Sequence, residues 1–280
     1  MMAELIDRKG MKAAVREMLS DAQVSPRAMT ALYCGLLLVL NMVSAFSGGS
    51  GVLSTFVTIL TSLLGVILGA GFAMYCMAIR RGERAEYLTL FDGFSFVGKL
   101  IGLTIVTALF IWLWSMLFII PGIIAAYRYR FALYNLYENP GIGIMEALDM
   151  SRRQTTGYKG QLFALDLSYL GWTLLASLPV IVEMSMMYYG LFASVFDYMN
   201  GTIAAMPSDF SAFAVLPAWL WTLISGLWSM AVSLFYLPNL HCMDLGFFEI
   251  AKRTSGVGAG AQPPAISAGP GAGPDGLGGL

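Results

Sequence analysis

The sequence predicts an all-α integral membrane protein, a polytopic helical bundle of about six transmembrane helices with both termini in the cytoplasm. First, 58% of the 280 residues are hydrophobic and only 12% are charged, whereas soluble domains are roughly 45–50% apolar and about 25% charged. Second, apolar stretches of about 20 residues, the length that crosses a bilayer, recur along the chain. Third, these stretches lack strand alternation, and only helices satisfy their own backbone groups in lipid.

Six apolar segments are long enough to be spans. They cover about 28–46, 52–79, 100–119, 121–137, 161–182 and 212–237. Pro121 would open the fourth segment, because proline suits the first turn of a helix.

Basic residues fix the predicted orientation. All but two of the 16 Lys and Arg residues lie before the first segment, between the second and third, between the fourth and fifth, or after the sixth. Lysine and arginine accumulate on the cytoplasmic side of membrane proteins. We therefore expect a multi-pass protein of the cell membrane whose basic connections face the cytoplasm.

Four stretches lie outside the predicted spans. Residues 1–27 form an amphipathic cytoplasmic lead-in, which either lies on the anionic inner leaflet or is simply solvated. A surface helix is expected at about 142–157. The outer connection 183–211 begins apolar and aromatic, and it continues the fifth helix, lies along the interface or re-enters the membrane. Residues 254–280 are rich in Gly, Pro and Ala, a composition typical of a disordered tail.

Three charged residues form a candidate intramembrane polar site. Asp166 would lie about 7 Å inside the fifth span and Arg130 about 12 Å inside the fourth, at 1.5 Å per residue. Charged residues inside a membrane are costly and usually paired, so we expect these two to form a bidentate pair. Alternatively, Asp166 only reaches the head-group region. Arg128 points about 200° away from Arg130, so it would contact a lipid phosphate instead.

Glycine pairs indicate close helix packing. Gly65 and Gly69, and Gly98 and Gly102, each form a GxxxG pair, which lets helices approach closely in lipid. Such contacts form within one chain or between chains, so a membrane-protein partner or a homo-oligomer stays open.

Membrane lipids are the partners that charge predicts. Arg152, Arg153 and Lys159 precede the fifth span, where they could contact the anionic inner leaflet. The net charge of −1 offers no global basic field for nucleic acid, so we expect no nucleic-acid partner.

Part of the chain resembles a bacterial integral-membrane family catalogued as domain of unknown function 975. The resemblance runs from about residue 14 to residue 252 and is strongest over 113–172. Its motifs are an IPGI turn, an Asn-Pro turn, an EAxxxS step, a GxK turn and an LDLS…GW span start. The matching residues there are Ile120, Pro121, Gly122, Ile123, Asn139, Pro140, Glu146, Ala147, Ser151, Gly157, Lys159, Leu165, Asp166, Leu167, Ser168, Gly171 and Trp172. The resemblance implies a polytopic membrane protein and brings no known activity.

Catalytic motifs are absent from the sequence. His241 is the only histidine, the three cysteines have no metal-ligand spacing, and neither a Walker A motif nor GxGxxG occurs. We expect no enzyme, no cofactor and no metal. Two hypotheses follow: a non-enzymatic membrane scaffold, regulator or envelope component, or a transporter, channel or lipid-handling protein that uses Arg128, Arg130 and Asp166.

Overall fold

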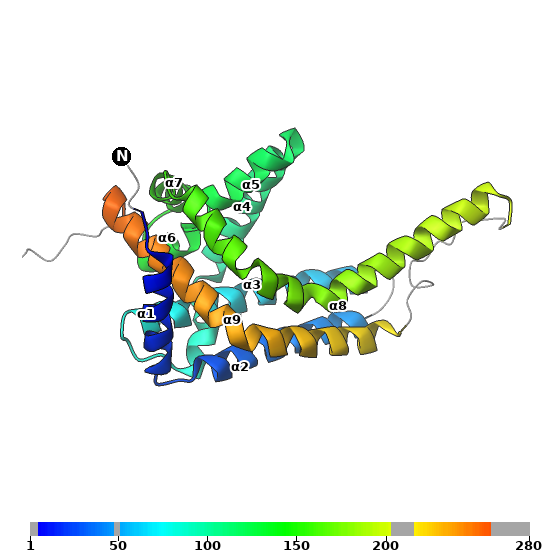
Figure 1. The fold of residues 1–280 in the computed structure, drawn as a ribbon, viewed down its shortest axis with the longest axis horizontal. Coiled ribbons are helices and arrows are strands. Elements are labelled where there is room, and N and C mark those ends of the chain that lie inside the picture. Colours follow the sequence, from blue (N-terminus) through cyan, green and yellow to red (C-terminus); the bar gives the residue numbers. More distant parts are fainter. Residues whose placement is uncertain (1–4, 48–50, 203–215, 259–280) are drawn as a thin grey trace, which may run out of the picture.

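The computed structural model describes residues 5–47, 51–202 and 216–258, and within them every regular element is a helix. In chain order the elements are α1 (Arg8–Ser20), α2 (Pro26–Phe46), α3 (Val52–Arg80), the 3-10 helix η1 (Tyr87–Phe96), α4 (Val97–Leu117), α5 (Ile119–Arg128), α6 (Ala132–Glu138), α7 (Ile144–Gln154), α8 (Lys159–Met199) and α9 (Ala218–Ser255). The predicted all-α fold is confirmed (Figure 1).

Five of the described segments are long and apolar enough to cross a membrane. They are Pro26–Phe46, Val52–Arg80, Tyr87–Leu117, Lys159–Met199 and Ala218–Ser255. Each of them overlaps one of the six predicted spans, and the fourth predicted span is not among them. These helices are compatible with a multi-pass membrane protein by length and composition.

The fourth predicted span, 121–137, is not one continuous helix. It is divided into α5, which ends at Arg128, and α6, which begins at Ala132. Helices α4 and α5 pack side by side as a hairpin (Figure 1), and α5 leads back toward the bundle. The chain thus runs back along α4 through two short helices, α5 and α6, instead of one long helix. The described ends of the chain still lie at the same end of the molecule (Figure 1).

The last two long helices exceed their predicted bounds. Helix α8 has 41 residues, about 60 Å at 1.5 Å per residue, roughly twice a hydrocarbon core. It bends along its length (Figure 1) and contains Pro179, and an interior proline removes a backbone hydrogen bond and kinks a helix. The part of the predicted outer loop from 183 to 199 is therefore helical, whereas 203–215 lies outside the described residues. Helix α9 continues past the predicted end at 237 to Ser255.

The densest core lies at one end of the bundle. Phe72 and Tyr75 of α3 pack there with Phe247 and Phe248 of α9, all fully buried. Toward the other end, large apolar side chains such as Phe56 are exposed. A protein in water does not leave so many large apolar groups uncovered, so this surface is suited to lipid.

Helix α1 differs from the expected surface-lying lead-in. It crosses α9 (Figure 1), and its apolar side is covered there, with Val15 buried. Arg8 Nη1 donates to the Ala164 carbonyl at 3.0 Å, and Lys12 Nζ donates to Ser168 Oγ at 3.3 Å. The apolar side of α1 is therefore occupied by the bundle instead of lying free for lipid.

The four predicted packing glycines behave differently from one another. Side-chain atoms added at Gly65 and Gly69 would meet α2 at ordinary contact distances, so these glycines face a helix of the same chain. At Gly102 an added Cβ would lie 2.6 Å from Ile144, whereas nothing lies within 4 Å at Gly98. The closest approach in the hairpin is at Gly122, where an added Cβ would lie 2.0 Å from Ser115 Oγ.

Candidate functional site

The break between α5 and α6 is closed by one hydroxyl group of α7. Ser151 Oγ donates to the Arg128 carbonyl at 2.8 Å and accepts from the Phe131 backbone N–H at 3.1 Å. These two backbone groups lie on either side of the break. Non-helical backbone is tolerated at membrane depth only where protein or water satisfies it, and Ser151 is fully buried. Ser151 therefore stabilises the interruption of the predicted span.

Arg130 lies at this break and binds two carboxylates from two other helices. Its Nη1 and Nη2 donate to the Oδ2 and Oδ1 atoms of Asp166 on α8, at 2.6 and 2.9 Å. Its Nε donates to Asp244 Oδ1 on α9 at 2.6 Å. The structure thus brings the expected Arg130–Asp166 pair together in bidentate geometry, the stronger form of such contacts. It also adds Asp244, which joins α9 to the pair.

Two tyrosines complete this network, named here the Arg130 network (Tyr127, Arg130, Tyr134, Asp166 and Asp244). Tyr127 Oη donates to Asp166 Oδ2 at 2.7 Å, and Tyr134 Oη donates to Asp244 Oδ2 at 2.9 Å. The Asp244 side chain is 9% exposed, whereas that of Asp166 is 35% exposed. Buried charges are tolerated when they are paired and hydrogen-bonded, a condition that this network meets.

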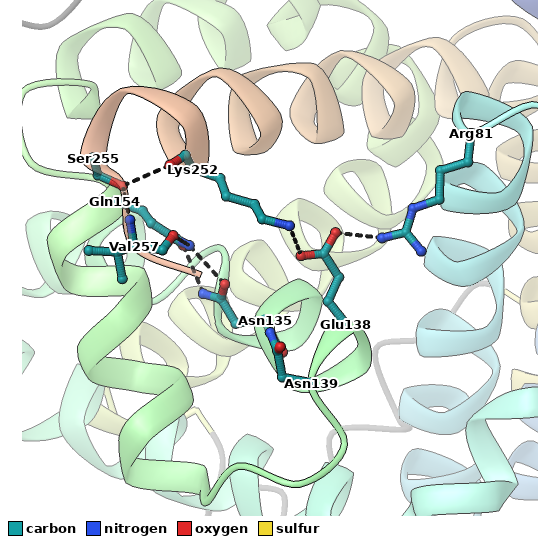
Figure 2. Close-up of polar contacts among 8 residues, drawn as sticks. All are labelled: Arg81, Asn135, Glu138, Asn139, Gln154, Lys252, Ser255 and Val257. Atoms are coloured by element: carbon teal, nitrogen blue, oxygen red, sulfur yellow. Dashed lines mark hydrogen bonds and ion pairs between the residues drawn. The ribbon is translucent and has the colours of Figure 1, made fainter. Parts of the chain in front are cut away.

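A second polar cluster joins three helix ends. Glu138 at the end of α6 accepts from Arg81 Nη2 at 2.5 Å and from Lys252 Nζ of α9 at 2.6 Å. Figure 2 shows the Glu138 carboxylate between these two cations. Its side chain is only 10% exposed, so solvent screens both contacts less than at an open surface. The basic ends of α3 and α9 are thus tied to α6.

A pair of buried amides lies beside that cluster. The side chains of Asn135 and Gln154 exchange two hydrogen bonds of 2.8 Å, and both are fully buried. Gln154 Nε2 also donates to the Val257 carbonyl at 3.1 Å (Figure 2). Helix α9 ends at Ser255, and the next residue, Gly256, has a φ of +66°, which glycine readily adopts. The chain therefore turns there and presents Val257 to α7.

The predicted basic lipid contacts separate into two groups. Arg153 pairs with Asp149 at 2.7 Å on the exposed face of α7. Arg152 and Lys159 form no ion pair in the described residues, and Thr155 Oγ1 donates to the carbonyls of both Arg152 and Arg128, at 3.3 and 3.4 Å. Arg128 thus lies beside the end of α7 that carries Arg152 and does not join the Arg130 network.

Sequence reasoning missed Asp244, Glu138 and the amide pair. The sixth span was predicted to end at 237, so Asp244 was placed beyond the membrane. Glu138 follows the fourth predicted span, and no sequence pattern singles it out. The one signal that could have found Asp244 is its position in an apolar run, LHCMDLGFF, which would have extended the sixth helix.

Two cavities lie away from the Arg130 network. One, of about 550 Å³, lies among α2, α8 and α9 and is lined by polar groups that include Asn41, Thr222 and Ser229. The other, of about 520 Å³, lies beside Phe96 and Lys99 at the start of α4. Neither is lined by Arg128, Arg130 or Asp166. Among the described residues, no group of three or more His, Cys, Asp or Glu side chains is arranged to hold a metal ion.

Comparison with known proteins returns a family for part of the chain. No curated protein and no solved structure matches it. The matched part contains α5, α6, α7 and α8, and so it contains Arg130, Ser151 and Asp166. As the sequence motifs indicated, residues 117–202 match the family described as Protein of unknown function (DUF975).

Proposed function

We propose that this chain is a non-enzymatic membrane scaffold or regulatory component of the bacterial cell envelope. In this proposal the helices fix the relative positions of the basic helix ends, and a partner protein binds the face that these ends form. The single observation that carries the proposal is the state of Arg130. Its guanidinium binds two carboxylates, Asp166 of α8 and Asp244 of α9. These contacts join both helices to the break between α5 and α6.

A transport site needs polar groups that face a path for the substrate. Intramembrane ionisable residues of transporters line such paths and exchange partners during transport. Here the Arg130 guanidinium makes three hydrogen bonds within the protein, and the two cavities described above lie elsewhere. The Arg130 network therefore acts as an internal brace in this proposal.

The face that we propose for partner binding is the one with the basic helix ends. Arg81, Glu138 and Lys252 meet at that end of the bundle, and Arg80 of α3 pairs with Glu249 of α9. The concentration of basic residues there supports its assignment to the cytoplasmic side of the cell membrane. Exposed side chains of α7, such as Met145 and Arg153, extend the same face.

One observation favours the second candidate function, proton or ion transport. Arg130 carries one positive charge and faces two carboxylates, so an additional proton or cation would balance the group. The Asp166 side chain is also one-third exposed. A transporter would use this imbalance to load and release its ion at the Arg130 network.

Two measurements on the same protein separate these functions. A photo-crosslinking amino acid at Met145 or Arg153 in growing cells is expected to give a discrete protein adduct, whereas the same group at Leu109, a 50% exposed apolar site on α4, is expected to give none. Proteoliposomes of the purified protein are expected to conduct no more protons than empty vesicles. Proton flux that disappears in Asp166→Asn, together with no adduct from Met145 or Arg153, would overturn the scaffold proposal.

A further inference from the structure

We propose that Arg128, Arg152 and Lys159 form a binding site for the phosphate group of an anionic phospholipid, at the junction of α5, α7 and α8. The three residues come from three helices that meet at Thr155. Thr155 Oγ1 donates to the carbonyls of Arg128 and Arg152 at 3.4 and 3.3 Å. The Thr155 carbonyl accepts from the N–H of Tyr158, the residue before Lys159, at 3.1 Å. We name this group the cation triad. It needs only a location in the membrane, and so it is independent of the scaffold function proposed above.

The position of Arg128 is fixed by α7. Arg128 is the last residue of α5, and its carbonyl accepts from Ser151 Oγ at 2.8 Å and from Thr155 Oγ1 at 3.4 Å. Arg152 lies between these two residues in the sequence. The same contacts that close the break in the backbone therefore hold Arg128 beside the helix that carries Arg152.

The triad lacks compensating negative charge within the described residues. Arg80, Arg81, Arg130, Arg153 and Lys252 each have a carboxylate partner. Arg128, Arg152 and Lys159 have no carboxylate partner in that part of the chain. Like charges in proximity raise the free energy of the folded chain, and a bound anion would reverse that effect.

Arg128 also has a buried donor without an acceptor. Its Nε is shielded from solvent and makes no hydrogen bond to the described residues, and its guanidinium lies 6.0 Å from the centre of the Trp114 ring. A buried N–H without an acceptor costs about 1–3 kcal/mol. A phosphate offers several acceptor oxygens, and arginine binds phosphate with well-matched geometry.

The start of α8 adds to the site. Lys159 is the first residue of α8, and the beginning of a helix carries partial positive charge and backbone N–H donors. At the next residue, Gly160, a Cβ would meet nothing within 4 Å. The helix start is therefore open on that side, which leaves space for an anion.

The surroundings favour a lipid over a soluble phosphate. Lys159 begins a segment that is long and apolar enough to cross a membrane. Apolar side chains of α4, α5 and α8 are exposed: Trp114 by 41%, Ile124 by 43% and Phe163 by 51%. They offer a surface for acyl chains, and tryptophan prefers the level of the head groups. The triad thus combines phosphate chemistry with an apolar flank.

The test compares lipid binding by charge variants of the full chain. Purified protein is placed in phosphatidylcholine nanodiscs with or without phosphatidylglycerol, and retained phosphatidylglycerol is counted by native mass spectrometry. We expect Arg128→Gln/Arg152→Gln/Lys159→Gln to reduce retention about tenfold or more, since each basic residue contributes to binding at an anionic surface. The matched control Lys9→Gln/Arg27→Gln/Arg84→Gln removes the same charge from α1, from α2 and from the connection after α3, and it should retain the lipid.

Two further arms separate the alternatives. If the triple variant fails to fold, Arg152→Gln alone is used, because Arg152 is exposed, and a loss of about threefold or more against Arg84→Gln is expected. Inorganic phosphate, added to protein in phosphatidylcholine nanodiscs, should not raise the melting temperature as phosphatidylglycerol does. Equal lipid retention by the triad and control variants would overturn the proposal. Stabilisation by inorganic phosphate equal to that by phosphatidylglycerol would overturn the assignment to a lipid.

Discussion

Ser151 of α7 donates its hydroxyl hydrogen to the Arg128 carbonyl at 2.8 Å, at the residue where α5 ends. The same oxygen accepts the N–H of Phe131, which lies just before α6. One side chain thus provides a hydrogen-bond partner for a backbone group on each side of the break, where groups at helix ends lack helical partners. The bend of the chain at this point places Arg130 against α8 and α9.

Replacing Ser151 with Ala should therefore destabilise the protein strongly. The change removes the acceptor of the Phe131 N–H and leaves the Arg128 carbonyl with only the longer bond from Thr155 Oγ1. A buried backbone group without a partner costs about 1–3 kcal/mol. Thermal unfolding in detergent is expected to show a clearly lower melting temperature. Ser177→Ala is the control, because Ser177 donates only within its own helix, to the Thr173 carbonyl. Equal melting of the two variants would contradict the role assigned to Ser151.

The Arg130 network predicts an unusual order of stability among charge variants. Arg130→Gln leaves two carboxylates without their cation, and breaking a buried ion pair in this way costs about 3–5 kcal/mol. Arg130→Gln/Asp166→Asn/Asp244→Asn has no charge left and should be more stable than Arg130→Gln alone. Melting temperatures in detergent measure this order.

The exposed pair Asp149 and Arg153 provides the control for that series. Their side chains are 48% and 66% exposed, so Asp149→Asn should change stability by no more than about 1 kcal/mol. If Arg130→Gln changed stability as little as Asp149→Asn, the network would not brace the helices. An exchange of charges between Arg130 and Asp166 is not a suitable rescue, because it would place a new carboxylate beside Asp244.

Glu138→Gln should loosen the end of α9. Glu138 is the shared partner of Arg81 and Lys252 and is nearly buried, so its neutralisation weakens two contacts at once. Hydrogen exchange of the backbone around Lys252 is expected to become faster. In Glu249→Gln only Arg80 loses a partner, and Glu249 is 44% exposed. Hydrogen exchange around Lys252 should therefore increase less in Glu249→Gln than in Glu138→Gln. Equal exchange rates in the two variants would argue against Glu138 as the residue that holds the end of α9 in place.

The sequence was sufficient for the fold class and for one contact of the network. Long apolar segments require helices in lipid, and Arg130 and Asp166 stand out because charges are scarce in such segments. The break at 129–131 could not be predicted, because neither glycine nor proline marks it. It depends on Ser151, which is 20 residues away from Phe131 in sequence. Asp244 was missed because hydropathy ended the sixth span too early.

Close packing of the α4–α5 hairpin predicts that Gly122 tolerates no side chain. A Cβ at this position would lie 2.0 Å from Ser115 Oγ and 2.9 Å from Ser115 Cβ. Gly122→Ala should therefore lower the melting temperature, and Ser115→Gly should partly restore it by removing both atoms. Gly98→Ala is the control, because nothing lies within 4 Å of its added Cβ and alanine favours helix by about 1 kcal/mol. A destabilised Gly98→Ala with a normal Gly122→Ala would contradict the packing.

Orientation in the membrane is tested with single cysteines and a label that cannot cross the bilayer. Tyr198 lies near the end of α8, far from the basic helix ends, and is 50% exposed, whereas Arg84 follows α3 at the basic end. Because basic ends stay in the cytoplasm, Tyr198→Cys should react in intact cells and Arg84→Cys only after permeabilisation. The unaltered protein gives the background, since Cys76 and Cys242 are buried and Cys34 is half-buried. Reaction of Arg84→Cys in intact cells, with Tyr198→Cys protected, would place the basic ends outside. The cation triad would then face the outer leaflet, and the proposed partner surface would lie outside the cytoplasm.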